Sequence, residues 1–253
     1  MVTVTQNLVV IAATVTGSLL FLTVMNLVWP REKRRIYNDL IGWQLSILGT
    51  TYAVILGFML YTVWTSYGEA DLNVDLEADA VMNVYRLAEG LPEPQRSELQ
   101  RSAFSYVQAV IEQDWPQMAR GEVPQQSVGI NSEMWKIVMS VRTASPTEQA
   151  AVDHALAELS SLNQHRLKRL LESTAQLPNV LWSVLLVGGV LTILAACTFG
   201  VESMRLHILQ VFSFSLLVSL SLVAIADIHR PFQGLIHVSD DAFQRAQQIM
   251  QAR

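Results

Sequence analysis

The sequence predicts an all-α membrane protein with four spanning helices and a helical extramembrane domain between the second and third spans. Hydrophobic residues make up 51% of the chain and charged residues only 15%, which is apolar for a soluble protein of this size. Four windows without charge are each long enough for the roughly 20 residues of a helical span. These windows are residues 1–30, 40–68, 173–201 and 206–226. No alternating apolar and polar run supports a strand.

The first span is expected over 8–29, where Pro30 ends the helix. No Lys or Arg precedes its apolar run and no small-residue cleavage site follows, so we expect a retained helix rather than a signal peptide. The loop behind it holds Arg31, Lys33, Arg34 and Arg35. Such clusters are typical of the cytoplasmic side, which favours an outside location for both termini and for the helical domain.

The second span is expected over 43–67, with aromatic residues toward both ends as interface anchors. Small or hydroxyl residues recur on one of its faces at three- and four-residue spacing, which lets another helix or a narrow water path approach the backbone. These residues are Ser46, Gly49, Thr50, Ala53 and Gly57. Only Gly68 interrupts the chain beyond Tyr67, so the helix is predicted to continue toward Glu89. Its packing stripe is predicted to be Leu72, Leu76, Ala80, Val84 and Leu87.

The extramembrane domain is expected over 69–172, which holds 16 of the 22 acidic residues. Prolines at 92 and 94 break the long helix, and the next helix is predicted to end at Trp115, before Pro116. A loop is expected over 120–129 and a short helix over 132–142. Ser145, Pro146 and Glu148 form a good helix start, from which a helix is expected toward Thr174.

Three aspartates, called here the acidic ridge, follow the second span at four-residue spacing: Asp71, Asp75 and Asp79. Like charges at this spacing repel one another, so water, bound cations or basic side chains have to offset them. One interpretation is ion pairing with Arg166, Lys168 and Arg169 on the helix that enters the third span. The other is a charged vestibule that biases which ions reach a pore mouth.

The third and fourth spans are expected over 180–199 and 206–228, followed by a C-terminal tail over 229–253 with a short helix. Gly188 and Gly189 in the third span allow close helix contact. Cys197, the single cysteine, is expected to pack as a small hydrophobe.

Several function classes lack the residues they need. The chain has no phosphate-binding glycine loop, no HExxH, no paired cysteines and no GxSxG, so no enzyme activity and no cofactor are expected. The five histidines lack helical metal-ligand spacing, and no metal site is assigned. A net charge of −5 without a basic patch argues against a nucleic-acid partner.

Residues from Tyr52 to Phe243 resemble, in order and spacing, the bestrophin-like membrane proteins of bacteria and plants. The second span and the helix after it contribute Tyr52, Leu56, Gly57, Phe58, Trp64, Tyr67, Glu77, Ala78, Tyr85 and Arg86. The domain contributes Tyr106, Asp114 and Trp115, and the later chain contributes Leu177, Pro178, Trp182, Pro231, Phe232 and Gly234. The resemblance implies a bestrophin-like oligomer.

A more distant resemblance to the bestrophins, which are pentameric anion channels, implies a neck in the second span. Alignment through Leu56, Gly57 and Phe58 places the neck positions on Thr50, Val54 and Phe58. Thr50 departs from the family, where the neck is apolar, and Val54 is smaller than the usual aromatic residue. Bestrophins also keep the helical domain cytoplasmic, opposite to the side that the charge count favours.

The C-terminal motif Pro231, Phe232 and Gly234 resembles a bestrophin segment that leads into a calcium-binding acidic run. Here only Asp240 and Asp241 follow. Calcium usually takes six to eight oxygen ligands, so no calcium site is assigned.

These features together predict a homo-oligomeric ion channel, a pentamer by resemblance, that conducts anions such as chloride. It would be a multi-pass protein of a bacterial inner membrane whose partners are the lipid bilayer, inorganic ions and copies of itself. Two alternatives stay open. One is a non-conducting membrane scaffold or envelope sensor that binds a protein partner, and the other is a cation-selective channel that uses the acidic ridge.

Overall fold

The computed structural model describes residues 4–252, which fold into helices and contain no strand within that range. Two compact units share the chain. The membrane unit is built from the chain up to Thr65 together with Gln176–His229, and the domain unit from Ser66–Ala175 and the chain from Arg230 onward. The predicted all-α fold class is confirmed.

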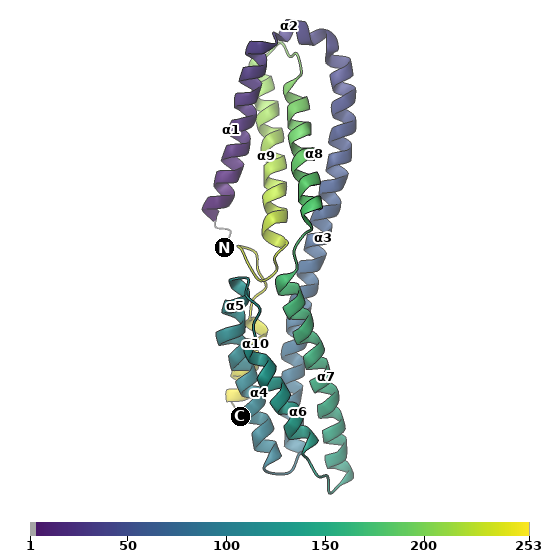
Figure 1. Cartoon of the computed structure of the whole chain (residues 1–253), viewed down its shortest axis with the longest axis vertical. Coiled ribbons are helices and arrows are strands. Elements are labelled where there is room, and N and C mark those ends of the chain that lie inside the picture. Colours follow the sequence, from purple (N-terminus) through teal and green to yellow (C-terminus); the bar gives the residue numbers. More distant parts are fainter. Residues whose placement is uncertain (1–3, 253) are drawn as a thin grey trace. The chain divides into compact units, whose positions relative to one another are not determined.

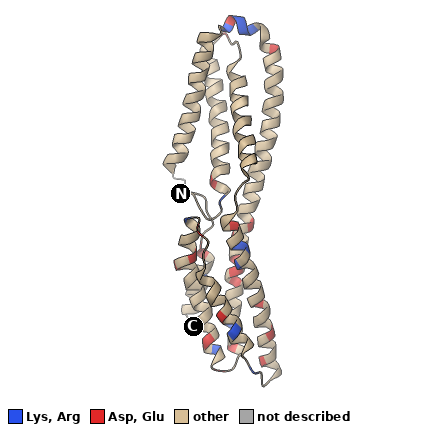
Figure 2. Cartoon of the chain, in the orientation of Figure 1, with Lys and Arg blue, Asp and Glu red and all other residues tan. Residues whose placement is uncertain are grey.

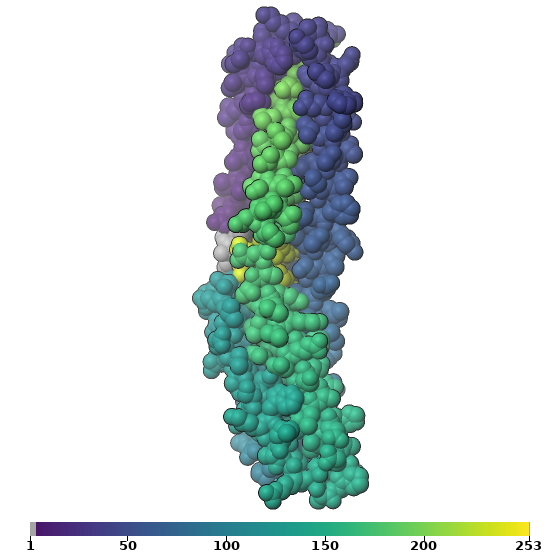
Figure 3. All heavy atoms as spheres, turned by 45° about the vertical axis from the view of Figure 1, so that its right-hand side comes forward, coloured from purple at the N-terminus to yellow at the C-terminus, as the bar shows by residue number. Residues whose placement is uncertain are grey.

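Four helices are long and apolar enough to cross a membrane, as predicted. They are α1 (Val4–Val28), the first part of α3 (Asn38–Leu87), α8 (Asn179–Cys197) and α9 (Met204–Ile228). Within the membrane unit α1 packs along α9, and α8 contacts both of them (Figure 1). Side chains of α8 fill the strip between α1 and α3 (Figure 3). Lys, Arg, Asp and Glu are nearly confined to the ends of these helices (Figure 2).

The domain unit packs the later part of α3 against five further helices. These are α4 (Gln95–Ala109), α5 (Trp115–Ala119), α6 (Gln126–Met139), α7 (Pro146–Thr174) and α10 (Asp241–Gln251). One apolar core joins residues of α3, such as Val74 and Val81, to Leu99, Leu159 and Phe243 on three other helices. Burial of this core is the main force that holds the unit together.

Two local predictions in the domain unit were wrong. The helix that begins at Gln95 does not stop at Trp115, because a π-helical turn over Val110–Asp114 widens the backbone and lets helix α5 pass through Pro116. Helix α6 begins at Gln126, inside the predicted loop. The helix start at Ser145 is confirmed, since its Oγ accepts a hydrogen bond of 3.2 Å from the Glu148 amide.

Candidate functional site: the two faces of helix α3

Helix α3 is the one element that belongs to both units. It runs from Asn38 to Leu87 without a break, as predicted from the lack of proline beyond Tyr67. Its 50 residues rise about 75 Å at 1.5 Å per residue, more than a bilayer's hydrocarbon core requires. The membrane part and the domain part each have one covered and one open face.

Tyr52 anchors the covered face in the membrane unit. Its side chain is only 4% exposed, and its hydroxyl donates a 3.0 Å hydrogen bond to the Leu185 carbonyl of α8. A Cβ added to Gly188 would lie 2.7 Å from the Tyr52 ring, and one added to Gly189 would lie 2.9 Å from its hydroxyl. The two glycines therefore make room for Tyr52, which confirms the predicted close contact.

The opposite face of the membrane part, called here the open face, carries the predicted neck and small-residue positions. Thr50, Val54 and Phe58 are all exposed, Val54 at 52% and Phe58 at 69%. A Cβ added to Gly49 or Gly57 would have no neighbour within 4 Å. Within the described chain, then, no second helix approaches this side. Ser46 and Ala53 are exposed on it as well.

Glu77 anchors the covered face in the domain unit through a buried polar cluster. Its carboxylate accepts hydrogen bonds of 2.8 and 3.0 Å from the Arg169 guanidinium of α7, and a 2.6 Å bond from the Tyr106 hydroxyl of α4. Arg169 also donates to Asp114 at 3.1 Å and lies 5.7 Å from the centre of the Trp115 ring. Glu77, Tyr106, Asp114 and Arg169 are all fully buried. The cluster therefore ties α3 to α4, α7 and the π-helical turn.

The neighbours of Arg169 keep its buried guanidinium charged. Burial alone would lower the pKa of Arg169, but Glu77, Tyr106 and Asp114 outweigh that effect and hold it above its ordinary value. Burial and then the Glu77 carboxylate raise the pKa of Tyr106 well above its usual range, so its hydroxyl stays a donor. Such a cluster tolerates the loss of one member poorly, because an unpaired charge would stay buried.

The predicted pairing of the acidic ridge with Arg166, Lys168 and Arg169 was wrong. Arg169 instead binds the buried Glu77 and Asp114. One weak signal in the sequence pointed to this contact, since Glu77 and Asp114 both belong to the bestrophin-like signature. Glu77 lies 92 positions before Arg169 in the sequence, and Asp114 lies 55 positions before it. Helical spacing relates only near neighbours in the sequence, so it does not reveal these two contacts.

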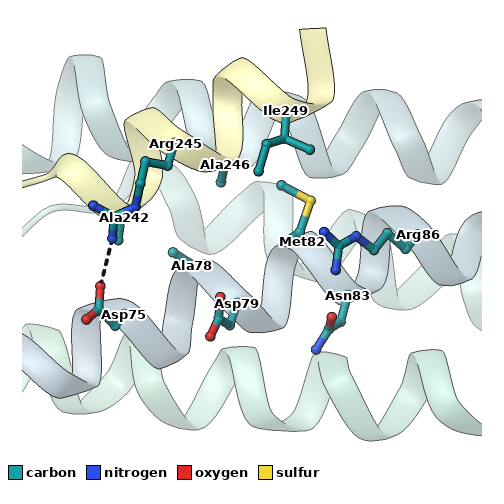
Figure 4. Close-up of a pocket in the computed structure, with 10 residues that line it drawn as sticks. All are labelled: Asp75, Ala78, Asp79, Met82, Asn83, Arg86, Ala242, Arg245, Ala246 and Ile249. Atoms are coloured by element: carbon teal, nitrogen blue, oxygen red, sulfur yellow. Dashed lines mark hydrogen bonds and ion pairs between the residues drawn. The ribbon is translucent and has the colours of Figure 1, made fainter. Parts of the chain in front are cut away.

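The acidic ridge itself lies on the surface of α3. Asp71, Asp75 and Asp79 are exposed, and Asp75 forms a 3.3 Å ion pair with Arg245 of α10 (Figure 4). Asp75 and Asp79 line a hollow of about 360 Å³ together with Arg86 and Arg245. Among residues 4–252, neither Asp71 nor Asp79 has a basic group within ion-pair distance. The nearby cations thus offset the ridge only in part.

A second hollow of about 500 Å³ lies between α3 and α7. Its polar lining includes Glu69, His165, Lys168 and Glu172. Burial raises the pKa of the Glu172 carboxyl to about 7, an effect that Lys168 opposes and that Glu69 and Glu77 increase. Burial and then Lys168 lower the pKa of His165, whose Nδ1 lies 2.7 Å from the Asn73 side-chain oxygen. Glu172 therefore titrates near neutral pH.

Leu72 and Leu76 line the same hollow, and this corrects the predicted packing stripe of α3. They are exposed, whereas Ala80 and Val84 are buried as predicted. The partner helices cover the side of α3 that carries Val74, Glu77 and Val81, so the two leucines fall at its edge.

The C-terminal motif packs inside the domain unit. Phe232 is buried edge-on against Trp115, with ring centres 5.7 Å apart, and Trp115 also contacts Phe243 at 5.9 Å. Gly234 has a φ of +87°, a conformation that glycine adopts without strain. Pro231 accepts a 2.7 Å backbone hydrogen bond from Val238. In the part of the chain that the structure describes, no group of three or more His, Cys, Asp or Glu is placed to hold a metal.

Comparisons with known proteins agree with this architecture. The chain is similar to two crystal structures of a bacterial bestrophin homologue from Klebsiella pneumoniae. The isoleucine-to-threonine variant has a TM-score of 0.63 at 14% identity, covering 90% of this chain and 95% of the other. The leucine-to-threonine variant has a TM-score of 0.62 at 12% identity, covering 98% and 100%.

At such low identity these structures show a shared fold. No curated protein matches the sequence. The family model of the bestrophin-like domain matches residues 12–243, which confirms the family that the signature residues indicated. The chain is a membrane protein that belongs to the bestrophin-like family.

Proposed function

We propose that this chain is one subunit of a homo-oligomeric ion channel whose pore is lined by the open face of α3. The observation that carries the proposal is the difference between the faces of one membrane helix. One face is fitted to α8 through Tyr52, and the other, with its glycines and threonine, meets nothing in the described chain. Copies arranged around an axis would place this face on a common water path.

The neck of the proposed pore is Thr50, Val54 and Phe58. Four-residue spacing keeps the three side chains on one side of α3, and all three are exposed in the single chain. Phe58 is the largest of them, so it would form the narrowest apolar ring. Thr50 would contribute a hydroxyl that the bestrophin neck lacks. Bestrophins are pentamers, so five copies around the axis is the stoichiometry proposed by resemblance.

Anion conduction, with chloride as the test ion, is the proposed selectivity, and it rests on the family resemblance. The acidic ridge supports the opposite selectivity. Positions 18 residues apart lie about five helical turns apart on the same side, so helix register alone aligns Asp71 with Ala53 and Asp75 with Gly57. Exposed carboxylates on the pore side of α3 would attract cations. Cation selectivity through Asp71, Asp75 and Asp79 is therefore the second candidate.

The experiment is a current measurement on purified protein in a planar bilayer under a KCl gradient. Reversal near the chloride potential supports the anion channel, and reversal near the potassium potential supports the cation channel. In an anion channel, the triple change of Asp71, Asp75 and Asp79 to Asn should leave the reversal potential unchanged. In a cation channel, the same change should shift the reversal potential toward zero. Phe58→Ala should change the conductance in either case.

A matched control for Phe58→Ala is Phe212→Ala. Phe212 is also exposed, at 40%, but lies on α9. The same truncation there should leave the conductance unchanged, since the residue is not on the proposed pore helix. Persistent silence of assembled protein would contradict the channel and favour a non-conducting scaffold whose open face packs against another protein. We place the protein in a bacterial inner membrane by resemblance.

A further inference from the structure

A small hollow in the membrane unit lies where two pairs of spanning helices are connected. The α1–α3 connection consists of α2 (Arg31–Arg34) and a short 3₁₀ turn (Arg35–Tyr37), and the α8–α9 connection is the loop over 198–203. Between them is a space of about 230 Å³. It is lined by Arg31, Glu32, Arg35, Gly200, Val201 and Glu202.

The walls of this hollow are fixed by direct contacts between the two connections. The Asn38 side chain binds both backbone groups of Gly200, donating to its carbonyl at 3.0 Å and accepting from its amide at 2.9 Å. Arg34 is fully buried and donates to the Cys197 carbonyl at 2.9 Å and to the Asn26 side chain. The hollow is therefore preformed and does not depend on loop closure.

Gly200 permits the closest contact in this junction. A Cβ at this position would lie 2.6 Å from the Arg35 nitrogen and 2.7 Å from the Arg31 carbonyl oxygen. These are backbone atoms of a helical turn, which cannot move aside as the end of a side chain can. The glycine thus lets the second loop lie directly on the backbone that carries both arginines.

Two arginines, Arg31 and Arg35, and two glutamates, Glu32 and Glu202, line the hollow. The α1–α3 connection adds Lys33 and the buried Arg34 beside it, so the surrounding charge is net positive and favours an anion. Arg35 forms a 2.6 Å ion pair with Glu202, and both side chains are largely exposed. Within residues 4–252 the Arg31 guanidinium has no carboxylate within ion-pair distance. Arg31 is therefore available to bind an anion, whereas Arg35 is held by its ion pair with Glu202.

We propose that this hollow binds the phosphate group of an anionic phospholipid, with Arg31 and Arg35 as its ligands. The planar guanidinium matches two phosphate oxygens at once, which a single ammonium does not do. The location favours a lipid as the carrier, because the hollow lies at the ends of four apolar helices, where phosphates of the headgroup region are found. The site does not depend on whether the chain conducts ions.

Native mass spectrometry of the purified full-length protein tests this site, with phosphatidylglycerol and phosphatidylcholine offered separately. Wild type should retain phosphatidylglycerol in preference to phosphatidylcholine. Arg31→Gln and Arg35→Gln should each weaken this retention about tenfold, the usual effect of losing one charge-assisted contact. Glu202→Gln should strengthen it, because Arg35 is then released toward the lipid.

Lys33→Gln is the matched control. It removes the same charge from the same connection, but Lys33 does not line the hollow. Retention should fall by no more than about twofold, because an exposed ammonium outside the hollow adds only a weak attraction and no hydrogen bond to the phosphate. An equal loss in Lys33→Gln and Arg31→Gln would overturn the site in favour of general attraction between charges. Inorganic phosphate that binds the wild type while phosphatidylglycerol does not would overturn the lipid as its ligand. Thermal unfolding of each variant shows whether an observed loss reflects binding or misfolding.

Discussion

The covered and open faces of helix α3 differ in what each side chain meets. On the covered face, Tyr52 fits against Gly188 and Gly189, and Glu77 joins a buried cluster with Arg169. On the open face, Thr50, Val54 and Phe58 are exposed. Side chains that the chain itself packs contribute to folding, whereas exposed ones are available for function. Changes on the covered face should therefore lower stability, and changes on the open face should alter conduction.

The largest expected effect is the loss of stability on neutralising Glu77. Glu77→Gln removes one of the two carboxylates that compensate the buried Arg169, and breaking such a cluster typically costs about 3 kcal/mol or more in free energy of unfolding. Thermal unfolding in detergent measures this change. Asp79→Asn is the control on the exposed side of the same helix and should cost less than about 0.5 kcal/mol. Equal losses in both variants would remove the distinction between the faces.

A pair of glycine substitutions sharpens the same comparison inside the membrane unit. Gly188→Ala places a methyl group 2.7 Å from the Tyr52 ring and should cost about 1–3 kcal/mol, the usual range for overpacking. Gly57→Ala adds the same methyl group where no neighbour lies within 4 Å, and should be neutral or stabilise by up to about 1 kcal/mol through helix propensity. Both are read from unfolding curves. Impaired oligomer assembly in Gly57→Ala would show that a neighbouring subunit, not water, contacts the open face.

Glu172, in the hollow between α3 and α7, should make stability depend on pH. Its pKa is raised from the ordinary 4.5 to about 7 by burial, so the folded state binds the proton more tightly than the unfolded chain. Stability should therefore fall as pH rises from about 4.5 to about 7 and change no further above that range. Glu172→Gln should flatten this part of the unfolding profile, while Glu133→Gln on the exposed side of α6 should not. An unchanged slope in Glu172→Gln would assign the pH dependence to another group.

The smallest expected effect belongs to the ion pair between Asp75 and Arg245. Both side chains are more than half exposed, and such pairs typically contribute about 0.2–1 kcal/mol, reduced further by salt. Asp75→Asn should thus shift the unfolding midpoint little at low salt and not measurably at high salt. A large shift at high salt would place Asp75 among the residues that hold the domain together.

Local patterns predicted the spans and the continuity of α3 well. The lack of charge over 40–68 and the absence of proline beyond it are properties of neighbouring residues, and a helix responds to them directly. The cap at Ser145 was predictable for the same reason. Pro116 was misread because the rule that proline ends a helix assumes an α-helical turn, and a π-helical turn precedes it here.

Contacts between distant residues were not predictable in the same way. The spacing of Asp71, Asp75 and Asp79 correctly identified an exposed ridge. Arg169, which was expected to pair with this ridge, instead forms a buried ion pair with Glu77. Leucines at 72 and 76 resembled core positions, yet the partner helices cover the neighbouring side of α3. Both misreadings have one physical cause, since the choice of buried face depends on packing partners far away in the chain.

Aqueous accessibility of Val54 is the measurement that tests the pore proposal most directly. Cys197 is the single cysteine and is buried, so Cys197→Ala gives a background without thiols. In this background Val54→Cys should react with a charged, membrane-impermeant thiol reagent, and the reaction should reduce the current. Leu209→Cys, at a position on α9 that is slightly more exposed than Val54 in the single chain, should stay unreactive in lipid. Protection of Val54→Cys together with an unchanged current would contradict a pore lined by α3.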